Sequence, residues 1–262
     1  MRRHLILFFV VTFAFTWALW LPAAWLARAA GAETTASSIL RIGGSYGPSL
    51  VAVGFVALQR KPPAVRQFLR RVVRISGPGR LWVFAVLFLP AAVGLGYVAN
   101  GVVTGTWPTP AFIADPFYLP IGIFYVLFLG GPLGEELGWR GYALDRMVLL
   151  MRPIWAGVLL GVVWTAWHIP LYFIPGSTQQ GIPFVLYLGF TTAQAIVYTV
   201  LYLRARRSIL IAILYHLFGN LALGLFPTLS LPVGLSVFAV VLLAGVLAIV
   251  ATHRRTLFTA PA

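Results

Sequence analysis

Two adjacent glutamates, Glu135 and Glu136, are the side chains of this sequence best suited to chemistry, and Arg140 follows four residues after Glu136. They lie in a glycine-rich, otherwise apolar run at 130–141, although the whole chain of 262 residues contains five acidic side chains. An unpaired carboxylate in a lipid-buried segment is costly, so charged groups in such segments usually serve a function. We therefore expect a functional site in this run.

The two glutamates should have different partners. On a helix, Glu136 and Arg140 share a face because they are four residues apart, whereas Glu135 is rotated by about 100° from Glu136. A carboxylate paired with arginine is held ionised, whereas an unpaired one in apolar surroundings takes up a proton more readily. We expect Glu135 to be free to act as a general base, with Glu136 and Arg140 as structural support.

Two further apolar stretches carry polar side chains at a spacing of four. Trp164 lies one helical turn before His168 and can pack against its ring, and His216 and Asn220 share a face further on. One alternative is that all these groups are interhelical hydrogen bonds, which contribute about 1 kcal/mol each. Hydrolysis is favoured over that alternative, because a glutamate, two histidines and an asparagine together supply a base and hydrogen-bond donors.

The composition indicates the environment of these groups. The chain has 60% hydrophobic and 9% charged residues and a mean hydropathy of +0.93, whereas about a quarter of residues are charged in soluble domains. It is therefore predicted to be an integral membrane protein. The absence of cysteine excludes disulfides, thiolate catalysis and cysteine-ligated metals.

The elements that position the motifs are predicted to be membrane-spanning helices. A span needs roughly 20 apolar residues, and that window predicts about eight: 5–28, 39–59, 81–100, 117–150, 154–174, 182–203, 208–228 and 231–252. We expect an all-α, polytopic transmembrane bundle forming one domain over 1–262, with its motif-bearing core at 117–228. The first span also has the basic start of a signal peptide, which stays open as the lesser alternative because its apolar core is longer than is usual for one.

The formal charge of +14 comes from clusters of Lys and Arg between the apolar stretches. Such clusters usually set membrane topology, so we expect no nucleic-acid partner, and lipid binding by the largest cluster, at 60–80, is the lesser alternative. Placing the N-terminus inside puts the basic clusters on the cytoplasmic side. We therefore predict a multi-pass protein of the cell membrane with both termini cytoplasmic.

The three motifs, Glu135-Glu136-x-x-x-Arg140, Trp164-x-x-x-His168 and His216-x-x-x-Asn220, each on its own span and in this order, resemble those of the CPBP family of intramembrane proteases. That family includes the type II CAAX prenyl endopeptidases and the Abi, or bacteriocin-immunity, proteins. The resemblance covers about 117–228. The chain departs from the family pattern at Trp164, where Phe is usual.

The resemblance implies an intramembrane endopeptidase in which Glu135 and His168 activate a water and His216 and Asn220 stabilise the oxyanion. These roles are physically sound, because a base must reach the water and an oxyanion needs convergent donors in a water-excluded site. The implied substrate is a membrane-associated protein or peptide, with prenylated CAAX-like sequences as one candidate class.

Three alternatives stay open at this point. Glu135, His168 and His216 also match the ligand set of zinc hydrolases, but no His-Glu-x-x-His is present and we favour a glutamate mechanism without a metal cofactor. The same residues could form the relay of a proton-coupled transporter or channel, against which the lack of an inverted repeat argues. A non-catalytic immunity-type membrane protein could also retain the motifs.

The motifs can meet only if their helices are interrupted. Counted as straight rods, Glu135 lies nearer the cytoplasmic end of its span than His168 does of its own. We therefore predict a break at Gly130-Gly131-Pro132 and an end of the fifth helix near Pro170 and Pro175. With these breaks, Glu135, His168, His216 and Asn220 are expected to converge on one cavity.

Overall fold

A computed structural model of the chain describes residues 1–58 and 63–260, so Arg60 and Lys61 of the largest basic cluster lie outside the described residues. Within the described residues the secondary structure is entirely helical. The elements are α1 (Arg2–Ala30), α2 (Thr35–Ser45), α3 (Gly47–Ala57), α4 (Pro63–Arg70), α5 (Gly79–Thr104), α6 (Ala111–Ala114), α7 (Tyr118–Leu129), α8 (Pro132–Glu136), the π-helix η1 (Leu137–Leu144), α9 (Asp145–Met147), α10 (Pro153–Trp167), the 3₁₀ turns η2 (Ile169–Phe173) and η3 (Thr178–Gly181), α11 (Phe184–Arg204), α12 (Leu210–Leu225), the 3₁₀ turn η4 (Thr228–Ser230), α13 (Pro232–Thr252) and α14 (Arg254–Phe258).

Each of the eight predicted spans corresponds to a helix or to a group of consecutive helices. Six of them are long and apolar enough to cross a membrane, and a seventh is the pair α2 and α3, which is bent by 40°. The range 208–228 holds α12, an apolar helix of 16 residues. At about 1.5 Å per residue, α12 is shorter than the roughly 30 Å of a bilayer core. The all-α polytopic bundle is confirmed, whereas the count of eight full spans is not.

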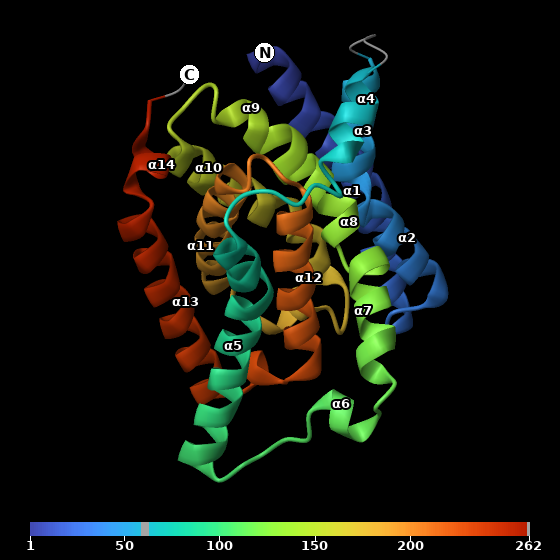
Figure 1. Cartoon of the computed structure of the whole chain (residues 1–262). Helices are drawn as coiled ribbons and strands as arrows, with labels where there is room; N and C mark the ends of the chain where they lie inside the picture. The colour runs from blue at the N-terminus through green and yellow to red at the C-terminus, as the bar shows by residue number, and fades with distance from the viewer. Residues whose placement is uncertain (59–62, 261–262) are drawn as a thin grey trace.

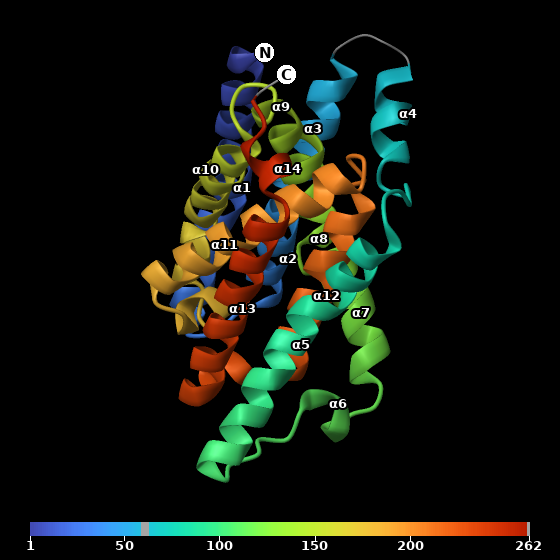
Figure 2. The ribbon, with the colours of Figure 1, turned by 60° about the vertical axis from the view of Figure 1, so that its left-hand side comes forward.

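The motif-bearing helices lie in the middle of the bundle. The segment α8–η1 packs against α3, α10 packs along α11, and α12 packs against α5, α7 and α8 (Figures 1 and 2). The buried apolar side chains of these helices belong to one continuous core. The start of α1 and the short helix α14 lie at the same end of the molecule (Figure 1). Which side of the membrane that end faces stays a prediction.

Both predicted helix breaks are present. Helix α7 ends at Leu129, Gly131 has a φ of +113°, and Pro132 opens α8. Glycine adopts such a positive φ readily, and proline is favoured in the first helical turn because its missing N–H would be unpaired there. Helix α10 ends at Trp167 and the chain continues through His168 into the 3₁₀ turn η2, which contains Pro170.

Two glycines allow α8 and η1 to lie directly on the corner between α2 and α3. A Cβ atom at Gly134 would lie 2.6 Å from the carbonyl oxygen of Ser45, and one at Gly138 would clash with the carbonyl oxygen of Pro48. Small residues four apart permit close backbone approach between membrane helices. The two glutamates between these glycines are thereby held at a fixed distance from α3.

A polar cluster joins the end of η1 to the start of α12. The hydroxyl of Tyr202 and Nη1 of Arg207 each donate to Oδ1 of Asp145 at 2.9 Å, and Nη2 of Arg71 lies 3.6 Å from the same oxygen. The backbone N–H of Ile209, just before α12, donates to the carbonyl oxygen of Arg71 at 2.9 Å. Part of the basic stretch that we interpreted as a topology signal therefore also fixes the helix that carries His216.

Candidate active site

Glu135 is a buried carboxylate with one oxygen held and the other left without a protein partner. Its side chain lies on α8, and Oε2 accepts a hydrogen bond of 2.6 Å from Nε1 of Trp164. Oε1 makes no hydrogen bond to the described residues. It borders the space beside Gly131, where an added Cβ would lie 2.6 Å from Oε1 and 3.4 Å from Nε2 of His216. Glu135 and His216 therefore face the same small space.

Glu136 points to a different set of partners. Its Oε1 accepts from Nη1 of Arg140 at 2.8 Å, which confirms the predicted pair, and also bonds Nδ1 of His216 at 2.8 Å. Glu136 and Arg140 are fully buried. A carboxylate paired with arginine can only accept a hydrogen bond, so Nδ1 of His216 carries the hydrogen of this contact. The bond from Glu136 to His216 was not predicted, since 80 residues separate the two in sequence.

The two glutamates thus diverge as expected, and the backbone changes form between them and the arginine. The π-helix η1 begins at Leu137, directly after Glu136, and includes Arg140. π-Helical turns are rare in proteins as a whole, and those that occur are often found at functional sites. The guanidinium carbon of Arg140 lies 3.5 Å from the ring centre of Tyr198, so the cation is also held against an aromatic face.

Trp164 connects most of the polar side chains. Its ring centre lies 5.6 Å from that of His168, which confirms the predicted packing, and 5.8 Å from that of His216. The guanidinium carbon of Arg140 lies 4.4 Å from the same ring. Glu135 was expected to be free, but Trp164 donates a hydrogen bond to it. The sequence did hold a signal for this bond, because Trp164 stands where Phe is usual and a buried tryptophan N–H needs an acceptor.

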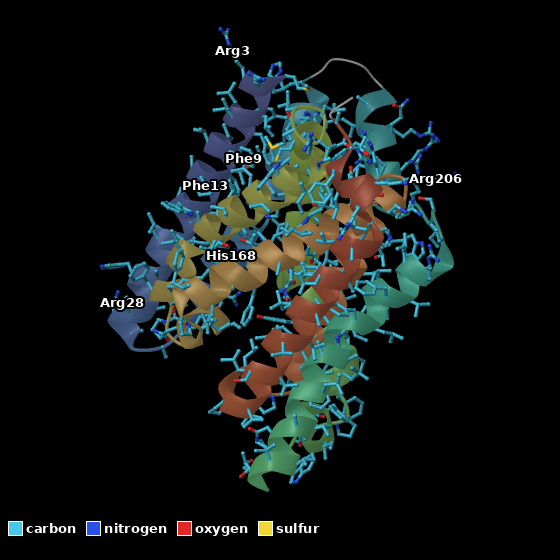
Figure 3. The ribbon with its side chains drawn as sticks, turned by 90° about the vertical axis from the view of Figure 1, so that its left-hand side faces the viewer. Arg3, Phe9, Phe13, Arg28, His168 and Arg206 are labelled. Carbon is cyan, nitrogen blue, oxygen red and sulfur yellow. The ribbon has the colours of Figure 1, made fainter. Side chains whose placement is uncertain are left out.

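His168 is held in one tautomer by the backbone. Its Nδ1 lies 2.7 Å from the carbonyl oxygen of Trp164, and since a carbonyl can only accept, Nδ1 carries the hydrogen. In the neutral ring, Nε2 is then a hydrogen-bond acceptor. In Figure 3, His168 lies between the levels of Arg3 and Arg28, which mark the two ends of α1. The histidine therefore lies at depth within the helical bundle.

Asn220 holds the break before Glu135. Its Nδ2 donates to the carbonyl oxygen of Gly130 at 3.1 Å. This carbonyl follows directly after the last residue of α7, where backbone oxygens lack helical partners. The asparagine amide has a second N–H, so holding Gly130 leaves one donor for another acceptor.

The corner between α2 and α3 holds the same segment from the other side. The hydroxyl of Tyr46 donates to the carbonyl oxygen of Phe128, and Oγ of Ser49 donates to that of Leu133 at 2.8 Å. Both contacts come from the first 116 residues, where no diagnostic motif is present. Sequence reasoning missed them because single tyrosines and serines give no spacing signal.

The structure therefore links all seven predicted site residues, but in two ways. Side-chain hydrogen bonds connect Glu135 with Trp164, and Glu136 with Arg140 and His216. His168 and Asn220 instead bond backbone carbonyls, those of Trp164 and Gly130. That four of them line one shared cavity stays a prediction.

A zinc ion would need Glu135, His168 and His216 as ligands, and the protonated Nδ1 atoms of both histidines would leave Nε2 for it. Among residues 1–58 and 63–260, however, no three His, Asp or Glu side chains are grouped closely enough to hold one ion. The present arrangement does not fit such a site, and we assign no catalytic step to a metal.

Comparisons with known proteins find a family likeness over the part of the chain that carries the motifs. Residues 116–222 match the family model described as "Type II CAAX prenyl endopeptidase Rce1-like". The chain is also 27% identical over 232 residues to "CAAX prenyl protease 2" of Methanococcus maripaludis, which covers 82% of each chain. The matched region contains all three motifs, and the homology supports intramembrane endopeptidase activity. Both likenesses support the resemblance of the chain to the CPBP family of intramembrane proteases.

Proposed function

We propose that Glu135 is the general base of a peptide-bond hydrolysis within the membrane. The observation that carries the proposal is the space beside Gly131, which Oε1 of Glu135 and Nε2 of His216 both border. The other polar atom of each side chain, Oε2 and Nδ1, is already hydrogen-bonded to protein. A water in that space would lie between a proton acceptor and a donor, as hydrolysis needs.

The proposed reaction begins with attack of this water on the scissile carbonyl carbon. Glu135 takes one proton from the water as the new C–O bond forms, and His168, whose Nε2 is an acceptor, orients the water together with it. The carbonyl oxygen becomes an oxyanion. When the C–N bond breaks, Glu135 returns the proton to the departing amine nitrogen.

His216 and Asn220 are proposed to stabilise the oxyanion. Because Nδ1 of His216 already donates to Glu136, its Nε2 can donate only if the ring is an imidazolium, which the Glu136 carboxylate would stabilise. Asn220 would contribute the amide N–H that does not bond Gly130. These two donors would favour negative charge that develops in the transition state.

The proposed substrate is a membrane-associated protein or peptide, cut in the cell membrane. The named relative is a CAAX prenyl protease, so a C-terminal CAAX-like sequence with an attached prenyl chain is the substrate class to test first. The buried position of Glu135 and His168 supports a substrate that reaches the site from the bilayer rather than from bulk water.

Cleavage of a prenylated CAAX peptide by the purified protein in lipid nanodiscs tests the proposal. Glu135→Gln and His168→Ala should each abolish cleavage. Glu33→Gln is the matched control, because it makes the same chemical change in a partly exposed glutamate that pairs with Arg41 instead. Full activity in Glu135→Gln would refute the proposed base. An unprenylated copy of the peptide tests the lipid requirement separately, and Glu135→Gln can be used to trap natural substrates.

A further inference from the structure

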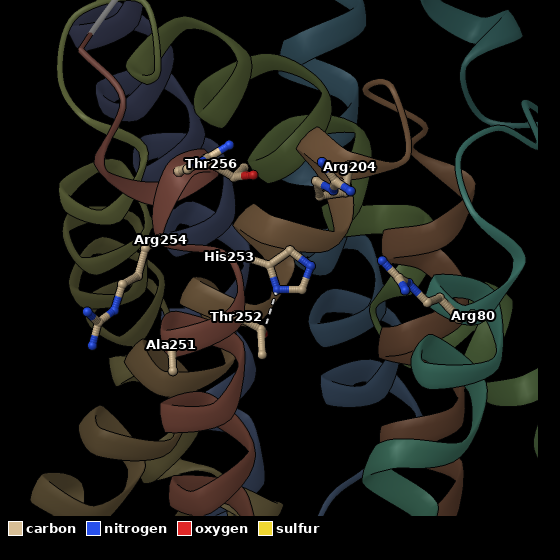
Figure 4. Close-up of a pocket in the computed structure, with 8 residues that line it drawn as sticks. Arg80, Arg204, Ala251, Thr252, His253, Arg254 and Thr256 are labelled. Atoms are coloured by element: carbon tan, nitrogen blue, oxygen red, sulfur yellow. Dashed lines mark hydrogen bonds between the residues drawn. The ribbon is translucent and has the colours of Figure 1, made fainter.

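A basic cleft lies away from the motif residues, at the end of the bundle where α5 begins and α11 and α13 end. It has a volume of about 580 Å³, and its lining includes four arginines and one histidine: Arg80, Arg204, His253, Arg254 and Arg255. Figure 4 shows Arg80 and His253 pointing toward one another across this cleft, with Arg204 beside them. Arginines from α5, α11 and α14 therefore gather at one place, with His253 between α13 and α14.

Within residues 1–58 and 63–260, the arginines of the cleft have no carboxylate partner. The chain has five acidic side chains, all among the described residues, and none lines the cleft. Their described ion pairs are to other cations: Arg41, Arg71, Arg140, Arg207 and His216. Within the described residues, the four arginine side chains of the cleft also make no hydrogen bond to protein. No group of the described residues therefore neutralises their positive charge, and an anion from outside the chain can supply the counter-charge.

The pKa of His253 is affected by the positive charge of the cleft. Its Nδ1 lies 2.9 Å from Oγ1 of Thr252. Burial lowers the pKa of His253, and the positive charges of Arg204 and Arg80 lower it further. An anion in the cleft would act in the opposite direction and favour the protonated ring.

The surroundings of the cleft suit an amphiphile better than a soluble anion. Val83 and Leu87 share the face of α5 on which Arg80 lies, and they are 58% and 56% exposed. On α13, Leu243 and Leu247 share the face of Ala251, which lines the cleft, and they are 58% and 60% exposed. Both helices therefore present an exposed apolar strip that starts at the cleft and runs toward the middle of the membrane span.

We propose that this cleft binds the phosphate of an anionic phospholipid, whose acyl chains lie along the apolar strips of α5 and α13. Arginine suits this ligand because its planar, permanently charged guanidinium donates two hydrogen bonds to phosphate oxygens. The position at the ends of three membrane helices places the cleft at the level of lipid headgroups.

Lipid retention by the full-length protein tests this assignment. We would measure binding of phosphatidylglycerol by native mass spectrometry in detergent, for the wild type and for Arg80→Gln/Arg204→Gln. Two arginines near a membrane surface correspond to about a 30-fold change in affinity, so the double variant should bind about 30-fold more weakly. The matched control is Arg66→Gln/Arg70→Gln, which removes the same charge from exposed side chains of α4 and should bind as the wild type does.

Two further measurements decide between explanations. The variant Arg80→Lys/Arg204→Lys keeps the charge and the fold, and it should retain more phosphatidylglycerol than the glutamine variant. Equal retention in the wild type and the glutamine variant, or an equal loss in the α4 control, would overturn the proposal. Inorganic phosphate at millimolar concentration is the soluble probe: displacement of phosphatidylglycerol by it would show that the cleft recognises free phosphate and not a lipid.

Discussion

Replacement of Glu136 by glutamine should destabilise the fold far more than the same replacement of Glu135. Glu136 and Arg140 are both fully buried and lie 2.8 Å apart, so Glu136→Gln leaves a buried guanidinium without its counter-charge. Removal of one partner from a buried ion pair costs about 3 to 5 kcal/mol. Glutamine keeps one oxygen acceptor, which places the expected cost at about 3 kcal/mol.

Glu135→Gln removes no ion pair. The amide oxygen of glutamine can still accept the 2.6 Å bond from Trp164, so we expect a stability change of less than about 1 kcal/mol. For a chain of this size, 1 kcal/mol corresponds to roughly 2 to 4 °C in the unfolding midpoint. Tm should therefore fall by about 6 to 12 °C in Glu136→Gln and by no more than a few degrees in Glu135→Gln.

Thermal unfolding followed by tryptophan fluorescence in one detergent measures this difference. A second variant separates loss of charge pairing from loss of shape: Glu136→Gln/Arg140→Met removes both charges and fills the space with an apolar side chain, and it should recover about half of the lost stability or more. Equal Tm values for Glu135→Gln and Glu136→Gln would refute the division of roles between the two glutamates. So would a double variant less stable than Glu136→Gln alone.

Three other predictions follow from the site and its support. Trp164→Phe keeps an aromatic ring but loses the donor to Glu135, so kcat should fall about tenfold or more with little change in Tm. The control Trp82→Phe loses a similar hydrogen bond, to the backbone carbonyl of Ser76, and should leave kcat unchanged. Gly138→Ala places a Cβ against the backbone of α3 and should lower Tm by several degrees, but Gly94→Ala, in an open part of α5, should not lower it. Exhaustive chelation should leave cleavage intact, because we propose a reaction that uses no metal; loss of activity that stoichiometric zinc restores would contradict it.

The fold was largely predictable because lipid imposes simple rules. Long apolar stretches must be helices in a membrane, and the breaks at Gly131 and after Trp167 follow from glycine and proline at those positions. The pairing of Glu136 with Arg140 follows from a spacing of four on one helix. The shortness of α12 was not predicted, because the range 208–228 was taken from its apolar residues alone; the helix ends at Leu225, two residues before Pro227.

Contacts between distant parts of the chain were not predictable in the same way. Glu136 meets His216 across 80 residues, and Tyr46 reaches the carbonyl of Phe128 across 82. Neither pair lies on one helix, so no periodicity in the sequence indicates the contact. Only the packing of α3 and α12 against the segment around α8 brings these groups together.

The contact between Glu136 and His216 changes what the second glutamate does in the proposed reaction. Without it, His216 could place its hydrogen on either nitrogen, and a neutral ring could donate through Nε2. With Nδ1–H committed to Glu136, only the imidazolium can donate to an oxyanion, and the buried carboxylate is the group that stabilises that cation. Glu136 would therefore support catalysis through the charge of His216 as well as supporting the fold through Arg140. In Glu136→Gln/Arg140→Met, the glutamine oxygen can still accept from Nδ1 but carries no charge to stabilise the cation. Recovery of stability should therefore occur without recovery of cleavage, and a double variant that regained both would show that the carboxylate matters for packing alone.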